Sequence, residues 1–150
     1  MFNFGQTSPL SKMAENAFQK PNFSVCFEPA NSLIRINWQG EVNESELLEG
    51  YKAALVVIKQ NPVQRILIDQ SRRQLIMKGD PEPMFETLFN EALRVIGSTV
   101  FLALVVSAEE FFLSSEVSRF GNYKNLTNEH IIVERFKNRT DAEAWLASVN

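Results

Sequence analysis

The sequence predicts an α/β fold: a single, mostly parallel β-sheet with an N-terminal antiparallel hairpin strand and four flanking helices. Strand-like and helix-like segments alternate from Phe23 to the end of the 150-residue chain, in the order β-β-α-β-α-β-α-β-α. Two strand-like segments, RILID (65–69) and TVFLALVVS (99–107), are almost wholly apolar, which is typical of parallel strands covered on both faces. The alternation therefore favours right-handed crossovers between parallel strands.

The first two strands are predicted to form an antiparallel hairpin. FSVCFEP (23–29) and LIRINW (33–38) alternate apolar and polar residues, and the intervening PANS supplies a turn. We expect the second strand to end at Gly40 and the first to lie at or near an edge of the sheet. Residues 1–22 have no sustained periodicity, so we expect an irregular arm or one short helix before a domain that spans 23–150.

The first helix is predicted after Val42. Asn43 is suited to cap it, and Glu46 completes a capping-box pattern. Asn61 and Pro62 end it, because proline cannot continue a helix and restricts the residue before it. The apolar residues at helical spacing on one face are Leu47, Leu48, Tyr51, Leu55 and Ile58.

The second helix is predicted to start near Asp80, a good capping residue. Pro81 then stands at the first helical position, where its missing N–H costs nothing. Gly97 is suited to end the helix. The apolar side consists of Phe85, Leu88, Phe89, Ala92 and Ile96.

Two further helices complete the predicted fold. AEEFFLSSEVSRFG (108–121) has weaker helical spacing and is expected to end at Gly121. The last strand, HIIVERF (130–136), leads to a closing helix. We expect Thr140 to cap this helix, with Glu143 in the capping-box position.

Composition and charge exclude several classes of protein. The net charge is −3 and the charged residues are interspersed, so the chain lacks the basic stripe that nucleic-acid binding requires. The longest apolar runs are far shorter than the roughly 20 residues that span a bilayer. The N-terminus lacks the pattern of a secretory signal, and the single cysteine, Cys26, excludes an internal disulfide. We therefore expect a cytoplasmic protein without a transmembrane segment.

Five phrases lie on the predicted elements: INWQGEV, ELLEGYKAAL, RILID, VFLALVVS and VERFKNRTDAEAWL. Together they resemble the SpoIIAA-like superfamily, which includes the STAS domains of anti-sigma-factor antagonists. The last phrase is similar to an ending common in small bacterial STAS/SEC14-type proteins. The resemblance covers about residues 23–150, and it implies a SpoIIAA-like fold and a regulatory function through protein interaction.

In STAS antagonists a phosphorylatable serine stands at the start of the helix after the RILID-like strand, among free helix N–H groups. The corresponding phrase here is IMKGDPEPM, in which Asp80 occupies the place of the phosphoacceptor. No Ser or Thr lies between Ser71 and Thr87. The resemblance therefore implies a member without the switch. Asp80 either imitates a permanently charged state or, as Asp does at most helix starts, serves as a cap.

Three charged residues lie at the carboxyl edge of the sheet, where open α/β folds bind ligands: Asp69, Arg72 and Arg73. The two arginines could hold an anion beside the start of the second helix, although Asp80 and Glu82 there would oppose it. Asp69 could accept a proton or bind a metal. A solvated arginine pair in an exposed loop is the simpler interpretation.

Motifs of the common enzyme classes are absent. The chain has no G-x-S-x-G, Walker or G-x-G-x-x-G motif. The only histidine, His130, lies far along the chain from Asp69, so no catalytic triad is indicated. Cys26 in an alternating strand is interpreted as a buried small hydrophobe. We expect a protein that is not an enzyme and uses no cofactor or metal.

The adjacent residues Phe111 and Phe112 cannot both point into the core from one helix, so one is expected to be partly exposed. It could contact a partner protein or a second copy of the chain, or line a pocket for a small apolar or amphipathic ligand. Ordinary core packing is the third explanation. The sequence thus predicts a protein-interaction or regulatory module, with a binder of a small apolar ligand as the alternative.

Overall fold

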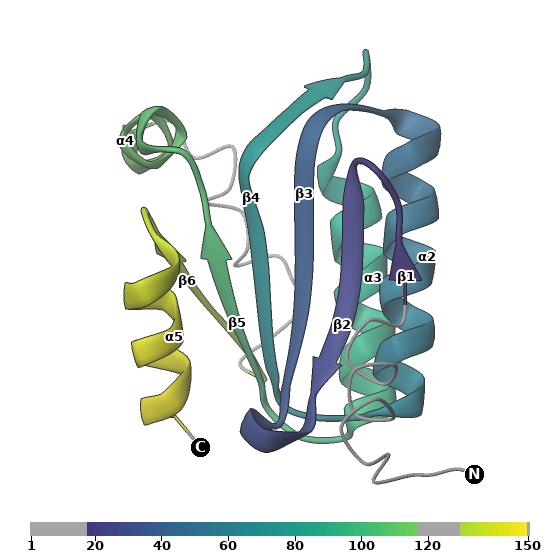
Figure 1. Cartoon of the computed structure of the whole chain (residues 1–150), viewed down its shortest axis with the longest axis vertical. Helices are drawn as coiled ribbons and strands as arrows, with labels where there is room; N and C mark the ends of the chain where they lie inside the picture. Colours follow the sequence, from purple (N-terminus) through teal and green to yellow (C-terminus); the bar gives the residue numbers. More distant parts are fainter. Residues whose placement is uncertain (1–17, 117–129, 150) are drawn as a thin grey trace, which may run out of the picture.

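The computed structural model describes residues 18–116 and 130–149. The strands are β1 (Phe18–Gln19), β2 (Phe23–Glu28), β3 (Leu33–Asn43), β4 (Arg65–Ile76), β5 (Val100–Val105) and β6 (Ile131–Phe136); the helices are α2 (Glu44–Gln60), α3 (Glu82–Ile96), α4 (Ala108–Glu116) and α5 (Arg139–Ser148), with a 3₁₀ turn at Pro29–Asn31. The strands form one sheet in the order β1-β2-β3-β4-β5-β6 (Figure 1). β2 is antiparallel to β1 and β3, and β3 to β6 are parallel. The predicted α/β class and mostly parallel sheet are confirmed.

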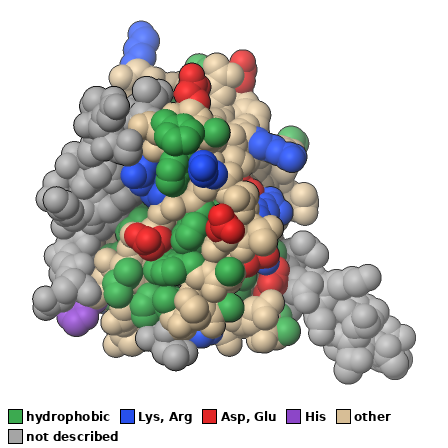
Figure 2. All heavy atoms as spheres, turned by 90° about the vertical axis from the view of Figure 1, so that its left-hand side faces the viewer, with side chains coloured by type: hydrophobic (Ala, Val, Ile, Leu, Met, Phe, Trp, Pro, Cys, Tyr) green, Lys and Arg blue, Asp and Glu red, His purple; other side chains and the backbone are tan. Residues whose placement is uncertain are grey.

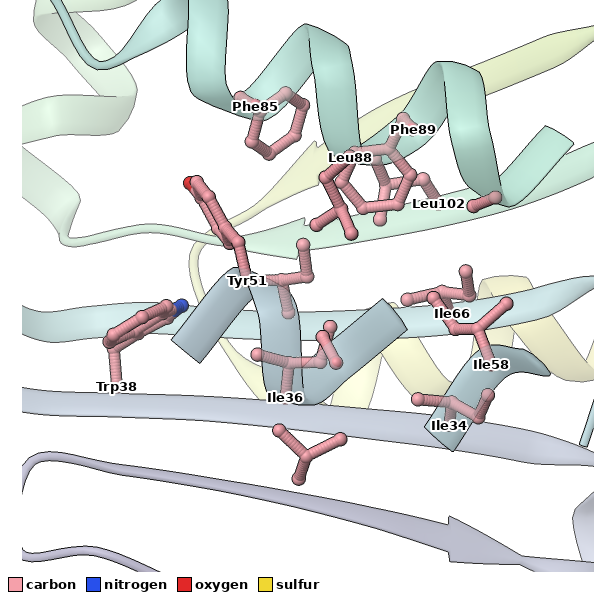
Figure 3. Packing of buried hydrophobic residues seen from close by; sticks show 14 of the residues in the cluster. Ile34, Ile36, Trp38, Tyr51, Ile58, Ile66, Phe85, Leu88, Phe89 and Leu102 are labelled. Carbon is pink, nitrogen blue, oxygen red and sulfur yellow. The ribbon is translucent and has the colours of Figure 1, made fainter. Parts of the chain in front are cut away.

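Helices cover both faces of the sheet. α2 and α3 lie side by side on one face, and α5 lies on the other (Figure 1). The larger core lies under α2 and α3, where side chains of the central strands meet helix residues such as Phe89 (Figure 3). The smaller core lies under α5 and joins Leu67 and Phe101 to Leu146. Central strands that are buried on both faces must be apolar on both, which explains RILID and VFLALV.

The predicted start of the first helix is confirmed. The side chain of Asn43 accepts a hydrogen bond from the N–H of Glu46 at 2.8 Å, and the Glu46 carboxylate accepts one from the N–H of Asn43 at 2.9 Å. Asp80 likewise accepts from the N–H of Glu82 at 3.0 Å, and α3 begins just after Pro81, one residue later than predicted. Both side chains satisfy backbone donors that a first helical turn leaves open.

The predicted cap of the closing helix is wrong by two residues. Asn138 rather than Thr140 caps α5, because its side chain accepts a hydrogen bond from the N–H of Asp141 at 2.8 Å. Glu143 is therefore not a capping-box residue. It forms an ion pair with Arg35 of β3 instead.

Two smaller expectations also differ, and a third concerns a residue that the structure does not describe. Residues 18–19, assigned to the irregular arm, form β1 and add a sixth strand, a pairing too short for any periodicity to develop. Leu48 of α2 is 42% exposed, because it lies beside the buried face and not on it. Gly121, the predicted end of the third helix, lies outside the described residues.

The main correction concerns β3 and β4, which continue past their predicted ends. β3 runs through Gly40 to Asn43, and β4 runs past Asp69 to Ile76. Gly40 has a φ of 73°, a left-handed conformation that glycine adopts without strain. The register shifts at Trp38, so that two residues of β4 stand opposite one residue of β3.

The second half of β4 contains the polar sequence SRRQ, which does not look like a strand. Its backbone pairs with β3 from Arg72 to Ile76. Val42 of β3 and Leu75 of β4 pack against the larger core. The composition of this segment is typical of a loop. Backbone pairing with β3 and these two apolar contacts nevertheless stabilise it as a strand.

Trp38 packs between the sheet and α2 with almost no exposed surface. Its ring centroid lies 5.4 Å from that of Phe23 and 5.7 Å from that of Tyr51. Figure 3 shows Trp38 and Tyr51. Gly50 of α2 approaches so closely that a Cβ there would lie 2.2 Å from Cη2 of Trp38. The helix can reach this position only because residue 50 has no side chain.

Replacing Gly50 by Ala should therefore destabilise the fold. We expect overpacking against Trp38 to cost about 1–3 kcal/mol, which exceeds the gain of up to about 1 kcal/mol from helix propensity. Urea denaturation measures the free energy of unfolding. Gly79→Ala is the control, because a Cβ there would lie 4.0 Å from its nearest neighbour, Met77 Cε. A Gly50→Ala variant as stable as the parent would contradict this account of the contact.

Candidate functional site

β4 divides the predicted site residues between the two faces of the sheet. Asp69 and Arg72 line one hollow of about 230 Å³, which the first residue of α5 also lines. Arg73 instead lies over the ring of Trp38. Successive side chains of a strand point to opposite faces, and the extra residue of the register shift brings Asp69 and Arg72 to the same side. Arg72 and Arg73, which were expected in a loop, are therefore consecutive residues of β4 on opposite faces of the sheet.

Asp69 is held by three hydrogen bonds inside the protein. Its Oδ2 accepts one from Nε of Arg139 at 2.6 Å. Its Oδ1 accepts two from Ser71, from the N–H at 3.0 Å and from the hydroxyl at 2.6 Å. Arg139 also donates from Nη2 to Oδ1 of Asn37 at 3.0 Å. Both carboxylate oxygens of Asp69 thus accept hydrogen bonds within the protein. The hydrogen bond from Nε of Arg139 to Asp69 orients the Arg139 side chain.

These contacts keep the carboxyl group of Asp69 ionised. Burial by itself raises the pKa, but the hydrogen bonds from Ser71 and Arg139 outweigh it, and the pKa of Asp69 lies below its ordinary value of 3.8. A carboxylate whose pKa lies below its ordinary value is a poor proton acceptor near neutral pH. Among the described residues, no three His, Cys, Asp or Glu side chains are grouped as metal ligands would be. The arrangement thus favours an orienting role for Asp69.

Arg139 is the site residue that the sequence analysis missed. It lies 70 positions from Asp69, so no local motif connects the two residues. One local signal exists, because a basic residue in the first turn of a helix opposes the helix dipole. Arg139 follows the capping residue Asn138 directly and so stands in the first turn of α5. A basic residue at this unfavourable position indicates that its side chain binds a partner outside the helix.

Arg73 belongs to the packing of the larger core. Its guanidinium carbon lies 5.7 Å from the ring centroid of Trp38. Arg73 also interacts with Tyr51. Burial raises the pKa of Tyr51 by more than the charge and hydrogen bond of Arg73 lower it, so the pKa lies above its ordinary value. Three buried donors here have no acceptor among the described residues: Nη1 of Arg73, Nε1 of Trp38 and Nε2 of Gln70. Each such donor costs about 1–3 kcal/mol, so close packing is what stabilises this end of the core.

Phe111 and Phe112 differ in exposure, which confirms that one of the pair is partly exposed. Phe112 is 59% exposed, whereas Phe111 packs against the larger core. Nζ of Lys137 lies 5.5 Å from the ring centroid of Phe111 and 5.3 Å from that of Phe112. Cζ of Arg135 lies 5.4 Å from the ring centroid of Phe111. We call these four residues the cation–aromatic patch; in Figure 2, Lys and Arg side chains flank the hydrophobic side chains in the upper part of this face.

The remaining candidate residues occupy structural or peripheral positions. Asp80 accepts the hydrogen bond from the N–H of Glu82 described above, although Pro81 and not Asp80 occupies the capping position of α3. Cys26, expected to be buried, is only half-buried in β2. His130 is exposed, directly before β6.

A second hollow, of about 460 Å³, lies between the β2–β3 turn and α5. Arg35 forms ion pairs there with Glu28 of β2 and Glu143 of α5. Arg65 donates two hydrogen bonds of 2.9 Å each to backbone carbonyls at the end of α5. The charged groups of this hollow therefore fasten α5 to the sheet.

Neither a scan against models of known protein families nor a search of curated proteins finds a match to this chain. Within residues 18–116 and 130–149, no helix has the length and apolar character needed to cross a bilayer. Function must therefore be inferred from the residues and their geometry.

The ion pair between Asp69 and Arg139 can be tested by titration. We expect the Asp69 carboxyl group to titrate below 3.8, so the stabilisation it gives is present above that pH and is lost as the pH falls through the lower folded-state pKa. Carboxyl-carbon NMR measures this pKa directly. Arg139→Gln should raise the pKa of Asp69, because a hydrogen bond to the charged form is removed, and Arg94→Gln on α3 should leave it unchanged. Titration of Asp69 above 3.8 in the parent protein would show that burial, and not hydrogen bonding, dominates.

Proposed function

We propose that this chain is a non-enzymatic protein-interaction module that binds a partner protein through the cation–aromatic patch. The observation that carries the proposal is the exposure of Phe112, which at 59% is the most exposed large hydrophobic side chain in the described residues. Aromatic and arginine side chains are enriched at the energetic centres of protein interfaces. The ring contacts Phe111 and Lys137, yet more than half of Phe112 remains at the surface, where a partner can reach it.

The cations of the patch indicate the chemistry of the partner. Lys137 stands over both rings, and no carboxylate among the described residues forms an ion pair with it. A partner segment with an apolar side chain against Phe112 and an Asp or Glu beside Lys137 would bury the ring and pair the ammonium group together. We therefore propose a partner segment that combines apolar and acidic residues.

We also propose that this interaction is regulatory and cytoplasmic, as in the STAS-like proteins that the sequence resembles, but without their phosphoserine switch. The mixed sheet with an N-terminal hairpin and four helices is compatible with a SpoIIAA-like fold. Asp80 accepts a hydrogen bond from the N–H of Glu82, the first residue of α3. The nearest preceding hydroxyl, that of Ser71, donates to Asp69 at 2.6 Å, where a phosphate would meet a carboxylate.

Within the described residues, no specific observation favours the alternative function, an apolar ligand pocket at the phenylalanine pair. Phe111 is packed against the larger core. The two described hollows are lined by residues other than Phe111 and Phe112. A partner surface therefore accounts better for the exposed ring.

Replacing Phe112 by Ala tests the proposed surface. Because the ring is exposed, we expect the free energy of unfolding to change by less than about 0.5 kcal/mol, while binding of the partner is lost. The partner is identified by cross-linking in the host cell, and its affinity is measured by calorimetry with purified proteins. Leu48→Ala, which removes an exposed leucine from α2, is the matched control and should bind normally.

Phe111→Ala serves as a second control, since it removes a ring that packs against the core and should lower stability more than Phe112→Ala does. The proposed surface is refuted if Phe112→Ala binds the partner with unchanged affinity. It is equally refuted if Phe112→Ala unfolds the protein, because the ring would then belong to the core.

The absence of a phosphorylation switch has its own test. Incubation with anti-sigma-type serine kinases and ATP should place no phosphate on residues 76–86, because this stretch has no hydroxyl side chain. Mass spectrometry of proteolytic peptides detects the product, with a serine-bearing STAS antagonist as the positive control. Phosphate on Ser71 would mean that the switch has moved along the strand, and the proposal of a switchless module would be withdrawn.

A further inference from the structure

We propose that the hollow lined by Asp69, Arg72 and Arg139 binds the carboxylate group of a small, polar organic anion. The inference is independent of the cation–aromatic patch, since none of the four patch residues lines this hollow. It rests on the place of the hollow in the fold, on its size, and on the balance of charges in its wall.

The hollow lies where the parallel pairing of β3 and β4 passes the end of β5, next to the start of α5. Open α/β sheets bind ligands beyond the carboxyl ends of their parallel strands. The volume of about 230 Å³ is below the roughly 300–1,000 Å³ of pockets for drug-sized ligands. The hollow therefore suits a molecule of a few heavy atoms better than a nucleotide.

The two arginines of the hollow have hydrogen-bonding capacity left. Arg139 uses Nε on Asp69 and Nη2 on Asn37, which sets the plane of its guanidinium group and leaves N–H donors over. Arg72 forms no ion pair with any carboxylate among the described residues. A planar, pre-oriented guanidinium group matches the two oxygens of a carboxylate.

The charge balance favours a monoanion. Lys20, Arg72 and Arg139 line the hollow with Asp69 as the acid, and Lys20 is 3.6 Å from Glu49 outside it. Among the residues that the structure describes, one positive charge therefore remains uncompensated. A phosphate group carries about 1.5–2 negative charges at neutral pH, and its second charge would lie near Asp69 without a described cation to match it.

Pro21, Phe23 and Trp38 also line the hollow, but most of the remaining wall is polar and indicates a polar ligand. The hydroxyl of Ser24 lies 3.5 Å from the amide nitrogen of Asn37, a long hydrogen bond that a ligand hydroxyl could replace. The amide group of Gln39 also lines the hollow and is engaged with the carbonyl of Pro21 at 3.0 Å. A short hydroxy acid fits these groups better than a fatty acid of any length.

The test is a two-dimensional NMR titration of the full chain that follows the backbone amides and the arginine Nε–H groups. The probes are sodium acetate and sodium glycolate at constant ionic strength, with acetamide as the neutral isostere and inorganic phosphate as the competing anion. We expect saturable shifts at Arg72, Arg139 and Asn37, with dissociation constants of about 1–10 mM for such small probes. Glycolate should bind more tightly than acetate, and acetamide should cause no saturable shift.

Arg72→Gln is the decisive variant, because Arg72 is exposed and holds no other described charge, so the fold should persist. We expect it to weaken glycolate binding at least about fivefold, with Arg72→Lys intermediate because it keeps the charge but loses the planar fork. Arg94→Gln, which removes an exposed arginine from α3, is the matched control and should bind like the parent. Phe112→Ala should also bind glycolate normally, so this inference and the proposed partner surface can fail separately.

Several results would overturn the inference. Shifts that grow linearly without saturation would mean that no site exists, and equal effects of acetamide and acetate would mean that the charge is not recognised. Tighter binding of phosphate than of either carboxylate would refute the proposed ligand class. Unchanged glycolate affinity in both Arg72 variants would remove Arg72 from the site and with it the charge argument.

Discussion

The register shift between β3 and β4 at Trp38 is the constraint on which the site depends. Without the extra residue in β4, every later side chain of that strand would point to the opposite face. Arg72 would then lie on the side of Trp38, and Arg73 would turn toward α5. With the shift, Arg72 shares the hollow with Asp69, and Arg73 stacks on Trp38. The close approach of Gly50 to the same ring links this register to the position of α2.

Most of the fold could be predicted because its signals are local. A capping box occupies four consecutive residues at the start of α2, and a central parallel strand is apolar along its length. The extensions of β3 and β4 could not be predicted in this way. Their polar sequence becomes a strand only through pairing with each other and through Val42 and Leu75, which reach the larger core. β1 could not be predicted, because two paired residues are too few to show the alternation of apolar and polar residues that is typical of a strand.

The candidate site could be predicted only in part, for the same reason. Asp69 and Arg72 were placed at the carboxyl edge of the sheet because each lies near the recognisable end of an apolar strand. Arg139 comes to them from 70 positions away, a distance that only the packing of α5 closes. Asn138 and Thr140 are both good capping residues, and local preference does not choose between them. The difference matters, because the true helix start places Arg139 in the first turn.

The short segment between β6 and α5 joins the two surfaces. Lys137 lies on the cation–aromatic patch, Asn138 caps α5, and Arg139 enters the hollow. A positive charge in the first turn opposes the helix dipole, and the contact with Asp69 offsets that unfavourable term. Asp69 holds the side chain of Arg139, and the Asn138 cap holds the backbone at Asp141. These hydrogen bonds shape the hollow and also fix the backbone from which Lys137 extends. The same segment between β6 and α5 thus positions a cation of the hollow and a cation of the cation–aromatic patch. It is held in place by Asp69, the last residue of β4 that pairs with β5.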